Sequence, residues 1–261
     1  MFDLLCKCRL CGLAFSEREM SEEHYPAKCV GNDDIVAVNI AEVFSEETIT
    51  EVSDRINGGE NVSKVADDIF DTKLSKSVYP NGRTARTLCR TCNTFLGKYD
   101  RAYMRFFEAD GLSIKTRGYQ QKTKLHIIKA IYAKFLSVPE TRDEKFDFVE
   151  FIKNEQLEQY DGKWRLYFIK RNHTTDLLGF KSLNTGKLEF DEGVVYELSD
   201  DKFIFNLMNF DKHECYLMTN IFDILNKNYT IVEGVDDSGG YHGQIMLLNL
   251  FKQMRLSEGE D

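Results

Sequence analysis

Four cysteines arranged as two Cys-X-X-Cys pairs are the residues whose spacing says most about chemistry. Cys8 and Cys11 lie in CKCRLCG, and Cys89 and Cys92 lie in TLCRTCN. Each pair presents two sulfurs on one tight turn, and two such pairs supply the four thiolates of a tetrahedral zinc site. We therefore predict a structural Zn²⁺ held by these residues. Cys6 forms a CXC with Cys8 and is a competing ligand, but the spacing favours Cys8 and Cys11.

An acid–base dipeptide, Glu23-His24, lies between the two cysteine pairs. Carboxylate oxygens suit a hard divalent ion such as Mg²⁺ or Mn²⁺, and an imidazole is suited to removing a proton from water near neutral pH. Together they suit attack on a phosphodiester, in which the histidine activates water and the metal stabilises the developing charge. The alternative is a structural histidine, which is the commoner role of a lone histidine.

Two further polar residues, Asn93 and Asp100, follow the last cysteine. Seven residues make nearly two helical turns, so both project from one face at a separation of roughly 10 Å. This separation favours separate roles: Asn93 would hydrogen-bond the imidazole of His24, and Asp100 would bind the metal. The alternative interpretations are a helix N-cap for Asn93 and a surface ion pair for Asp100.

The motifs CRLC, EHYPAK, CRTCN and GKYD follow one another in an order that resembles the HNH endonucleases, or ββα-metal nucleases, in their zinc-stapled subgroup. The resemblance covers residues 6–32 and 86–105. It implies a β-hairpin followed by a helix around one catalytic divalent ion. It also implies that His24 is the general base and that Asn93 orients it. Asp100 and Glu23 would then bind the catalytic metal.

The chain departs from this family pattern in three places. Asp100 stands where the family often has histidine, and Pro26 lies two residues after His24, where many members have proline three residues after it. The segment from Lys28 to Arg86 is much longer than usual. We interpret this segment as an inserted subdomain that gates the site or binds a partner.

Basic residues are concentrated in one stretch of an acidic chain. The chain carries a net charge of −9, whereas residues 80–135 contain twelve basic and three acidic residues, a net charge of +9. Lys98, Arg101 and Arg105 share one face of the helix expected after Asn93. Because the field near a site governs binding, we expect this face to contact the phosphate backbone of a nucleic acid. The alternative is a solvated helix surface.

The expected fold class is α+β, with a nuclease core split by an insertion. Residues 1–32 and 80–115 would form the core, residues 33–79 an acidic helical insertion, and residues 116–261 a C-terminal α+β domain for recognition or assembly. Apolar spacing predicts helices over 44–59, 124–138 and 144–160. Alternating patterns predict strands over 163–171, 186–193, 194–200 and 202–210.

These features predict a metal-dependent HNH endonuclease. The family resemblance implies that its substrate is DNA and that it acts in restriction or anti-phage defence. The alternative is a zinc-stapled nucleic-acid-binding module, or a subunit that a partner must activate. A protein partner or a second copy would bind through the C-terminal domain.

No apolar run is long enough to span a bilayer, and the first residues lack the features of a signal peptide. We therefore expect a cytoplasmic protein whose seven cysteines favour metal binding or free thiols over disulfides.

Overall fold

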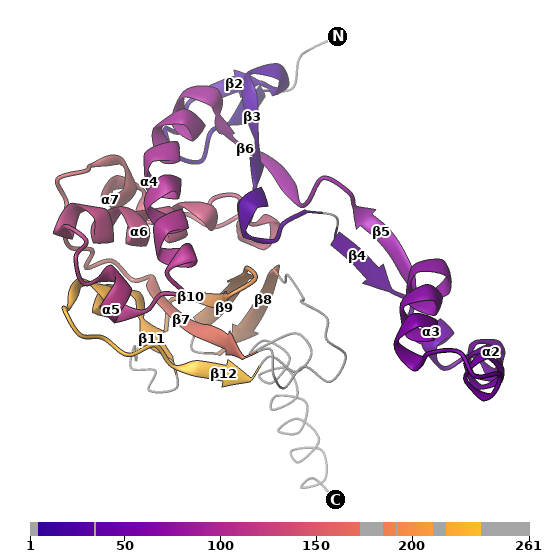
Figure 1. The fold of residues 1–261 in the computed structure, drawn as a ribbon. Helices are drawn as coiled ribbons and strands as arrows, with labels where there is room; N and C mark the ends of the chain where they lie inside the picture. Colours follow the sequence, from indigo (N-terminus) through magenta and orange to yellow (C-terminus); the bar gives the residue numbers. More distant parts are fainter. Residues whose placement is uncertain (1–4, 34, 173–184, 192, 211–217, 236–261) are drawn as a thin grey trace, which may run out of the picture. The chain divides into compact units, whose positions relative to one another are not determined.

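A computed structural model of the chain describes residues 5–33, 35–172, 185–191, 193–210 and 218–235 (Figure 1). The chain divides into two compact units, Met1–Gly31 with Thr84–Asp261 and Asn32–Arg83. The smaller unit contains residues 33–79, the stretch expected to form the insertion. Helices and strands are mixed in both units.

The first unit begins with a hairpin and a strand pair. β1 and β2 form an antiparallel hairpin, β3 pairs in antiparallel fashion with β6, and α4 follows β6 directly (Figure 1). The bounds are β1 Leu5–Lys7, β2 Ala14–Ser16, β3 Met20–His24, β6 Thr84–Cys89 and α4 Arg90–Glu108. α4 contacts both β3 and β6. Two antiparallel strands thus lead into a helix, and residues 32–83 are inserted between the strands.

Helix α4 is amphipathic, and its apolar stripe is buried. Leu96, Tyr99, Tyr103 and Phe106 recur at helical spacing and are at most 7% exposed. The helix ends near Gly111, whose N–H donates to the carbonyl of Phe106 at 3.0 Å and whose φ is 64°. A glycine is needed there, because a Cβ at this position would lie 2.6 Å from Ile231 Cδ1.

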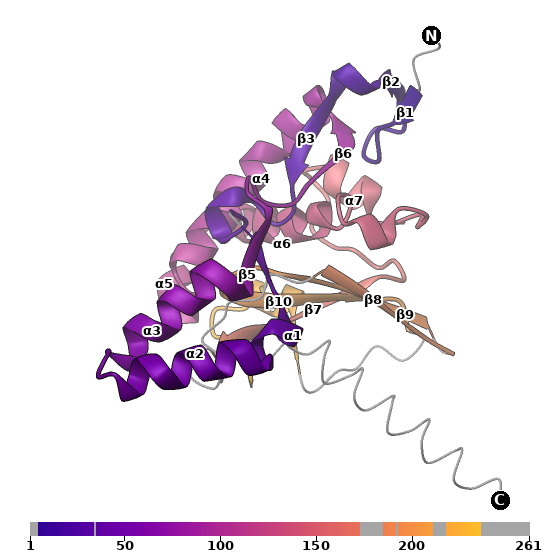
Figure 2. The same cartoon turned by 90° about the vertical axis from the view of Figure 1, so that its right-hand side faces the viewer.

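Helix α6, Gln121–Lys134, packs against α4 and is buried on most of its circumference. Both helices lie over one face of a sheet (Figure 2). We expected residues 116–261 to form a separate domain, but the chain has no boundary between compact units at residue 116. The physical reason is that α4, α6 and the sheet share one hydrophobic core.

Six strands of the described residues form this sheet, in the order β11–β7–β10–β9–β8, with β12 pairing parallel to β7. The bounds are β7 Arg165–Asn172, β8 Thr185–Phe190, β9 Gly193–Ser199, β10 Phe203–Met208, β11 Thr219–Asn220 and β12 Glu233–Val235. Side chains alternate between the faces. Phe168, Phe203 and Phe205 join the core shared with α4 and α6, whereas Ile169 and Ile204 join a second apolar cluster. The four predicted strands are confirmed.

The prediction of a helix over 144–160 is wrong for most of this stretch. Only α7, Val149–Lys153, is α-helical. The backbone becomes extended at Asn154, and its carbonyl accepts a hydrogen bond from Lys129 Nζ at 2.7 Å. The Asp147 carboxylate, which precedes α7, accepts a hydrogen bond at 2.9 Å from the N–H of Lys163, which follows it. These tertiary hydrogen bonds outweigh the local helical pattern.

The second unit consists of a strand pair and helices. β4 and β5 are antiparallel, and α2, which confirms the helix predicted over 44–59, is capped by Ser45. The bounds are β4 Ile35–Val38, α1 Ile40–Val43, α2 Glu46–Asn57, α3 Val62–Ile69, a π-helix Phe70–Leu74 and β5 Ser75–Tyr79. Arg55 on α2 pairs with Glu60 and with Asp68 on α3. Residues 32–83 carry eleven acidic and five basic side chains, so the unit is acidic as expected.

The remaining helices are short. They are η1 Glu17–Glu19, η2 Lys28–Val30, α5 Ser113–Thr116, η4 Pro139–Thr141 and η6 Ile221–Leu225. Among the described residues, no helix combines the length and the apolar character that crossing a membrane requires.

Candidate functional site

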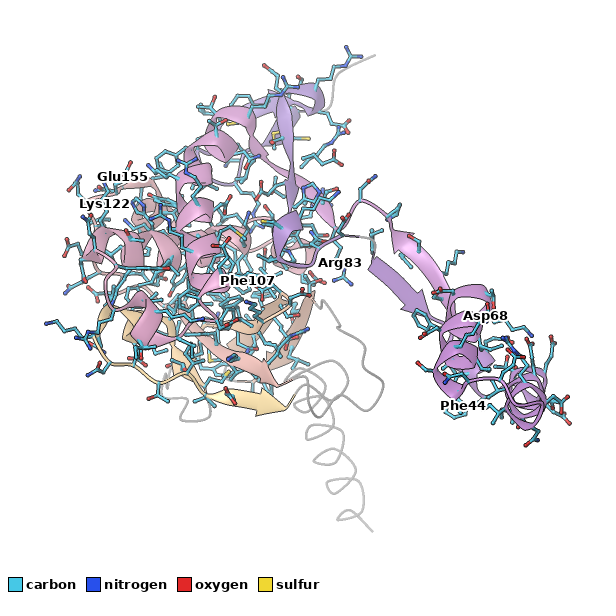
Figure 3. All side chains as sticks on the ribbon, viewed as in Figure 1. Phe44, Asp68, Arg83, Phe107, Lys122 and Glu155 are labelled. Atoms are coloured by element: carbon cyan, nitrogen blue, oxygen red, sulfur yellow. The ribbon has the colours of Figure 1, made fainter. Side chains whose placement is uncertain are left out.

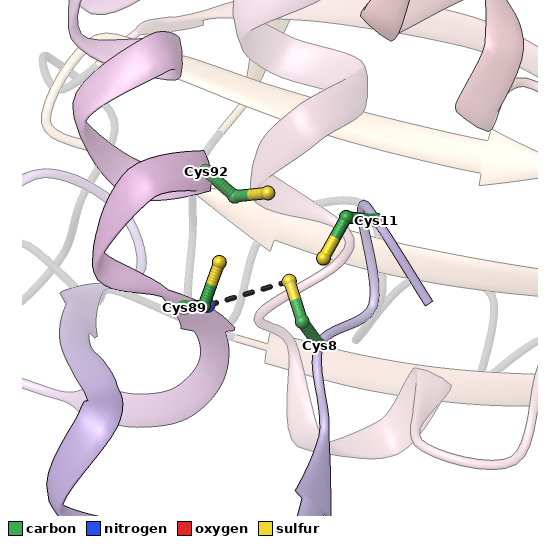
Figure 4. A group of neighbouring side chains, drawn as sticks. All are labelled: Cys8, Cys11, Cys89 and Cys92. Carbon is green, nitrogen blue, oxygen red and sulfur yellow. Dashed lines mark hydrogen bonds between the residues drawn. The ribbon is translucent and has the colours of Figure 1, made fainter. Parts of the chain in front are cut away.

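The four cysteines of the two Cys-X-X-Cys pairs lie together in space. Cys8 and Cys11 come from the segment between β1 and β2, and Cys89 and Cys92 come from the end of β6 and the first turn of α4 (Figure 4). Their four Sγ atoms all lie within 4.8 Å of one another, and Cys6 is not in this group. Zn–S bonds of about 2.3 Å in a tetrahedron separate the sulfurs by about 3.8 Å, so a small contraction would accommodate zinc.

The surroundings of these thiols shift their pKa values in opposite directions. Burial raises the pKa of Cys92 and of Cys11. Burial acts in the same direction on Cys8, but backbone N–H groups, those of Cys11 and Cys89 foremost, outweigh it and lower the pKa of Cys8 to about 7. The N–H of Cys89 lies 3.3 Å from Cys8 Sγ. The four sulfurs lie close enough together to bind a metal such as zinc, and a bound metal would favour the thiolate form.

An arginine inside the first Cys-X-X-Cys turn anchors the cluster to the rest of the unit. The Arg9 guanidinium donates to the carbonyl of Leu136 at 2.9 Å and to the Oγ1 and carbonyl of Thr141 at 2.8 and 2.7 Å. It also lies 5.3 Å from the ring centroid of Phe146. No local pattern indicated this role, because the hydrogen-bond partners of Arg9 lie far away in the chain.

The pairing of β3 with β6 is irregular beside Glu23. Ser21 pairs with Leu88 and Glu23 with Ala85, so β6 has one more residue than β3 between these two pairs. Glu23 is buried, with 7% of its surface exposed. His24 is the last residue of β3, pairs with Thr84 and is partly buried.

Glu23 and Asp100 converge on one cation. The Lys134 ammonium, from the last residue of α6, forms a short ion pair with Glu23 Oε1 and lies 3.3 Å from Asp100 Oδ1. Burial opposes the charge on Lys134, but Asp100 and Glu23 outweigh it and raise the pKa of this lysine. Two carboxylates expected to share a role are thus brought together by a lysine that sequence reasoning had counted only as part of a basic stretch.

Asn93 lies in the first turn of α4 and contacts β3. Its Nδ2 donates to Ser21 Oγ at 2.7 Å. The N-cap of α4 is Cys89, so the interpretation of Asn93 as a helix N-cap is wrong. A hydrogen bond from Asn93 to His24 stays a prediction, since the observed bond connects Asn93 to the strand that carries His24.

The three basic residues proposed to contact DNA differ in their surroundings. Lys98 pairs with Glu155, which also lies 3.5 Å from Lys122 (Figure 3), and the Lys98 ammonium lies 3.7 Å from the ring centroid of Phe95. Arg101 and Arg105 are exposed, and neither guanidinium forms an ion pair with any described residue.

The basic stretch as a whole is not one surface. Lys124 is buried and donates to the carbonyl of Asn226 at 3.0 Å, and Lys129 is buried and donates to that of Asn154. The net charge of +9 therefore overstates the positive charge that is open to a ligand.

A small cavity of about 20 Å³ lies beside the Lys134 side chain, room for about one water-sized group. Pro26, Tyr103 and Asp200 also line it. Asp200 is 1% exposed, and burial raises its pKa to about 6 although Tyr103 donates a short hydrogen bond to it.

The donor atoms at Glu23 and Asp100 fit a hard divalent ion, because such ions prefer carboxylate oxygens. Their charge is already partly balanced by Lys134. The sulfur cluster fits zinc by donor type and geometry.

Comparison of the chain with models of protein families, with curated proteins and with solved structures finds no match.

Proposed function

We propose that the first unit is a metal-dependent endonuclease of the HNH type that hydrolyses DNA phosphodiester bonds. The observation that carries the proposal is that Glu23 and Asp100 both contact Lys134, with His24 following Glu23 in the sequence of β3. Metal-assisted phosphodiester hydrolysis needs acidic side chains that bind the metal and a base that takes a proton from water, and these residues supply both types. The order of the sequence motifs supports the same family.

In this proposal His24 is the general base. It takes a proton from a water molecule whose oxygen forms a bond to phosphorus while the bond from phosphorus to the leaving oxygen breaks. The leaving oxygen takes a proton from solvent. Glu23 and Asp100 would hold Mg²⁺ or Mn²⁺, which when bound supplies neutralisation of the phosphate charge.

Other residues would position these groups. Asn93 ties α4 to β3 through Ser21, and so fixes the helix that carries Asp100 against the strand that carries His24. A zinc ion on the cysteine cluster would join the same two segments. Arg101 and Arg105 would contact the phosphate backbone.

The second candidate is a zinc-stapled binding module, or a subunit that becomes active only with a partner. One observation favours it: the carboxylates that would bind the catalytic metal already have an ammonium partner in Lys134. We place the role in restriction or anti-phage defence with the leading proposal, since both rest on the family resemblance.

Incubation of zinc-loaded protein with supercoiled plasmid tests the proposal. We expect nicking or linearisation with added Mg²⁺ or Mn²⁺, and none when the added ion is withheld. Withholding the ion is preferable to adding EDTA alone, because EDTA also competes for the structural zinc. His24→Ala and Asp100→Ala should each lose cleavage by about a hundredfold or more.

Glu108→Ala is the matched control, since Glu108 is an exposed acid two turns beyond Asp100 on the same helix. It should cleave as the original chain does. Cleavage that persists in Asp100→Ala, or that is lost equally in Glu108→Ala, would argue against the assigned site.

A further inference from the structure

The cation that contacts Glu23 and Asp100 is a side chain of the protein, the ammonium of Lys134. Lys134 Nζ contacts both carboxylates, and its side chain is 12% exposed, while that of Glu23 is 8% exposed and that of Asp100 is 30% exposed. Two carboxylates and one ammonium leave a formal charge of −1. The three groups come from β3, α4 and α6, so the arrangement depends on the packed unit and not on local sequence.

A divalent ion and this ammonium cannot both bind the two carboxylates at the same time. Both are attracted to the same oxygens, and at a separation of about 4 Å in a partly buried site they repel each other strongly. A divalent ion that binds Glu23 and Asp100 must therefore push the ammonium away. The affinity for the metal is therefore reduced, because its binding breaks the ion pairs of Lys134 with Glu23 and Asp100.

We infer that Lys134 is a resident cation that occupies the divalent-ion position between Glu23 and Asp100 and competes with the metal for it. Lys134 thereby sets the concentration of divalent ion at which the site fills. The identity of the site as a metal site rests on the proposed function, whereas the competition rests on the contacts of Lys134.

Binding of Mn²⁺ to the full-length, zinc-loaded chain tests this inference without any cleavage assay. The loss of the EPR signal of free Mn²⁺ reports the bound fraction. Lys134→Gln removes the competing charge and should bind Mn²⁺ on the order of tenfold or more tightly than the original chain. Lys134→Arg keeps the charge and should not gain affinity.

The matched control is Lys73→Gln in the second unit. Lys73 also lies between two carboxylates, 2.9 Å from Glu47 and 2.7 Å from Glu51, but on an exposed helix surface. This variant should not gain comparable affinity. A double variant, Lys134→Gln with Asp100→Asn, should lose the gain, which ties it to the proposed pair.

Removing Lys134 leaves Glu23 buried without its cation, so thermal unfolding is measured with each variant. If Lys134→Gln is unstable, the inference requires Mn²⁺ to restore its fold at concentrations that leave Lys73→Gln unchanged. Failure of that rescue, or a folded Lys134→Gln that binds Mn²⁺ no more tightly than the original chain, would overturn the inference.

The outcome is separable from that of the proposed function. Tighter Mn²⁺ binding without any DNA cleavage would support the competition and count against the nuclease. DNA cleavage together with unchanged Mn²⁺ affinity in Lys134→Gln would support the nuclease and count against the competition.

Discussion

Arg9 shows how a single residue can hold a metal-binding turn in place. Its guanidinium donates hydrogen bonds to three backbone carbonyls and one hydroxyl that follow α6, and burial lowers its pKa. A lysine could not make this planar set of bonds, because its donors radiate from one nitrogen. The first cysteine pair is therefore fixed by the core as well as by any bound metal.

We predict that Arg9→Ala lowers the free energy of unfolding by about 3 kcal/mol, because it leaves buried carbonyls without donors. Urea unfolding of the zinc-loaded protein measures the change. Arg86→Ala is the control, since the exposed pair of Arg86 with Glu17 at 3.1 Å should contribute less than about 1 kcal/mol. Equal effects of the two variants would contradict the anchoring role.

Residue types and spacing were sufficient to predict the four cysteines as one cluster and to single out Glu23 and Asp100. They could not predict Lys134 or Arg9. Lys134 meets Glu23 across 111 residues of chain, and no local pattern encodes such a contact. The register shift beside Glu23 is likewise a property of the pairing of β3 with β6, which only the fold determines.

At the scale of elements, α4 joins three parts of the proposed site. Its first turn carries Cys92 and Asn93, its middle carries Asp100, and its exposed face carries Arg101 and Arg105. The helix was predictable because its apolar residues recur at helical spacing. The length of α7 was not, because the tertiary bond to the carbonyl of Asn154 ends that helix early.

We predict that Arg101→Ala together with Arg105→Ala weakens binding to a DNA duplex and reduces the slope of log affinity against log salt by about 2. Lys98→Ala should change the slope less, because Lys98 already has an ion-pair partner in Glu155. Fluorescence anisotropy over a range of salt concentrations measures both. An unchanged slope in the double variant would show that this face does not meet the phosphates.

The acidic charge of the insertion leads to a separate prediction about DNA affinity. Residues 45–72 contain eight acidic and two basic side chains, and we hypothesise that this acidic segment competes with DNA for the basic face. Deleting 45–72 should raise DNA affinity several-fold at low salt. The same gain is expected from the full-length chain in which Glu46, Glu47, Glu51 and Asp54 on α2 are replaced by their amides. Unchanged affinity in both would refute the hypothesis.

At the scale of the whole molecule, one core joins segments from distant parts of the chain. The cysteine cluster closes the loop between residues 11 and 89, and the same unit continues into the six-stranded sheet. The sequence predicted the sheet strands through their alternation. It did not predict that the sheet and the N-terminal segments share a core, since alternation does not say which surface a strand face meets.

Removal of zinc should therefore act on the whole first unit. We predict that the zinc-free protein melts on the order of 10 °C lower than the zinc-loaded protein, because metal binding to the folded cluster is coupled to folding. Differential scanning calorimetry with measured zinc content tests this. Cys89→Ser should lower the melting temperature similarly, whereas Cys29→Ser, an exposed cysteine outside the cluster, should not.

The most direct test of the central claim measures binding and cleavage of the same labelled DNA duplex by the zinc-loaded protein and by His24→Ala, with Mn²⁺ present. The account predicts that His24→Ala binds the duplex as the original chain does but cleaves it at least about a hundredfold more slowly. A folded, zinc-loaded original chain that binds the duplex and never cleaves it would contradict the claim, as would a His24→Ala variant that cleaves at the original rate.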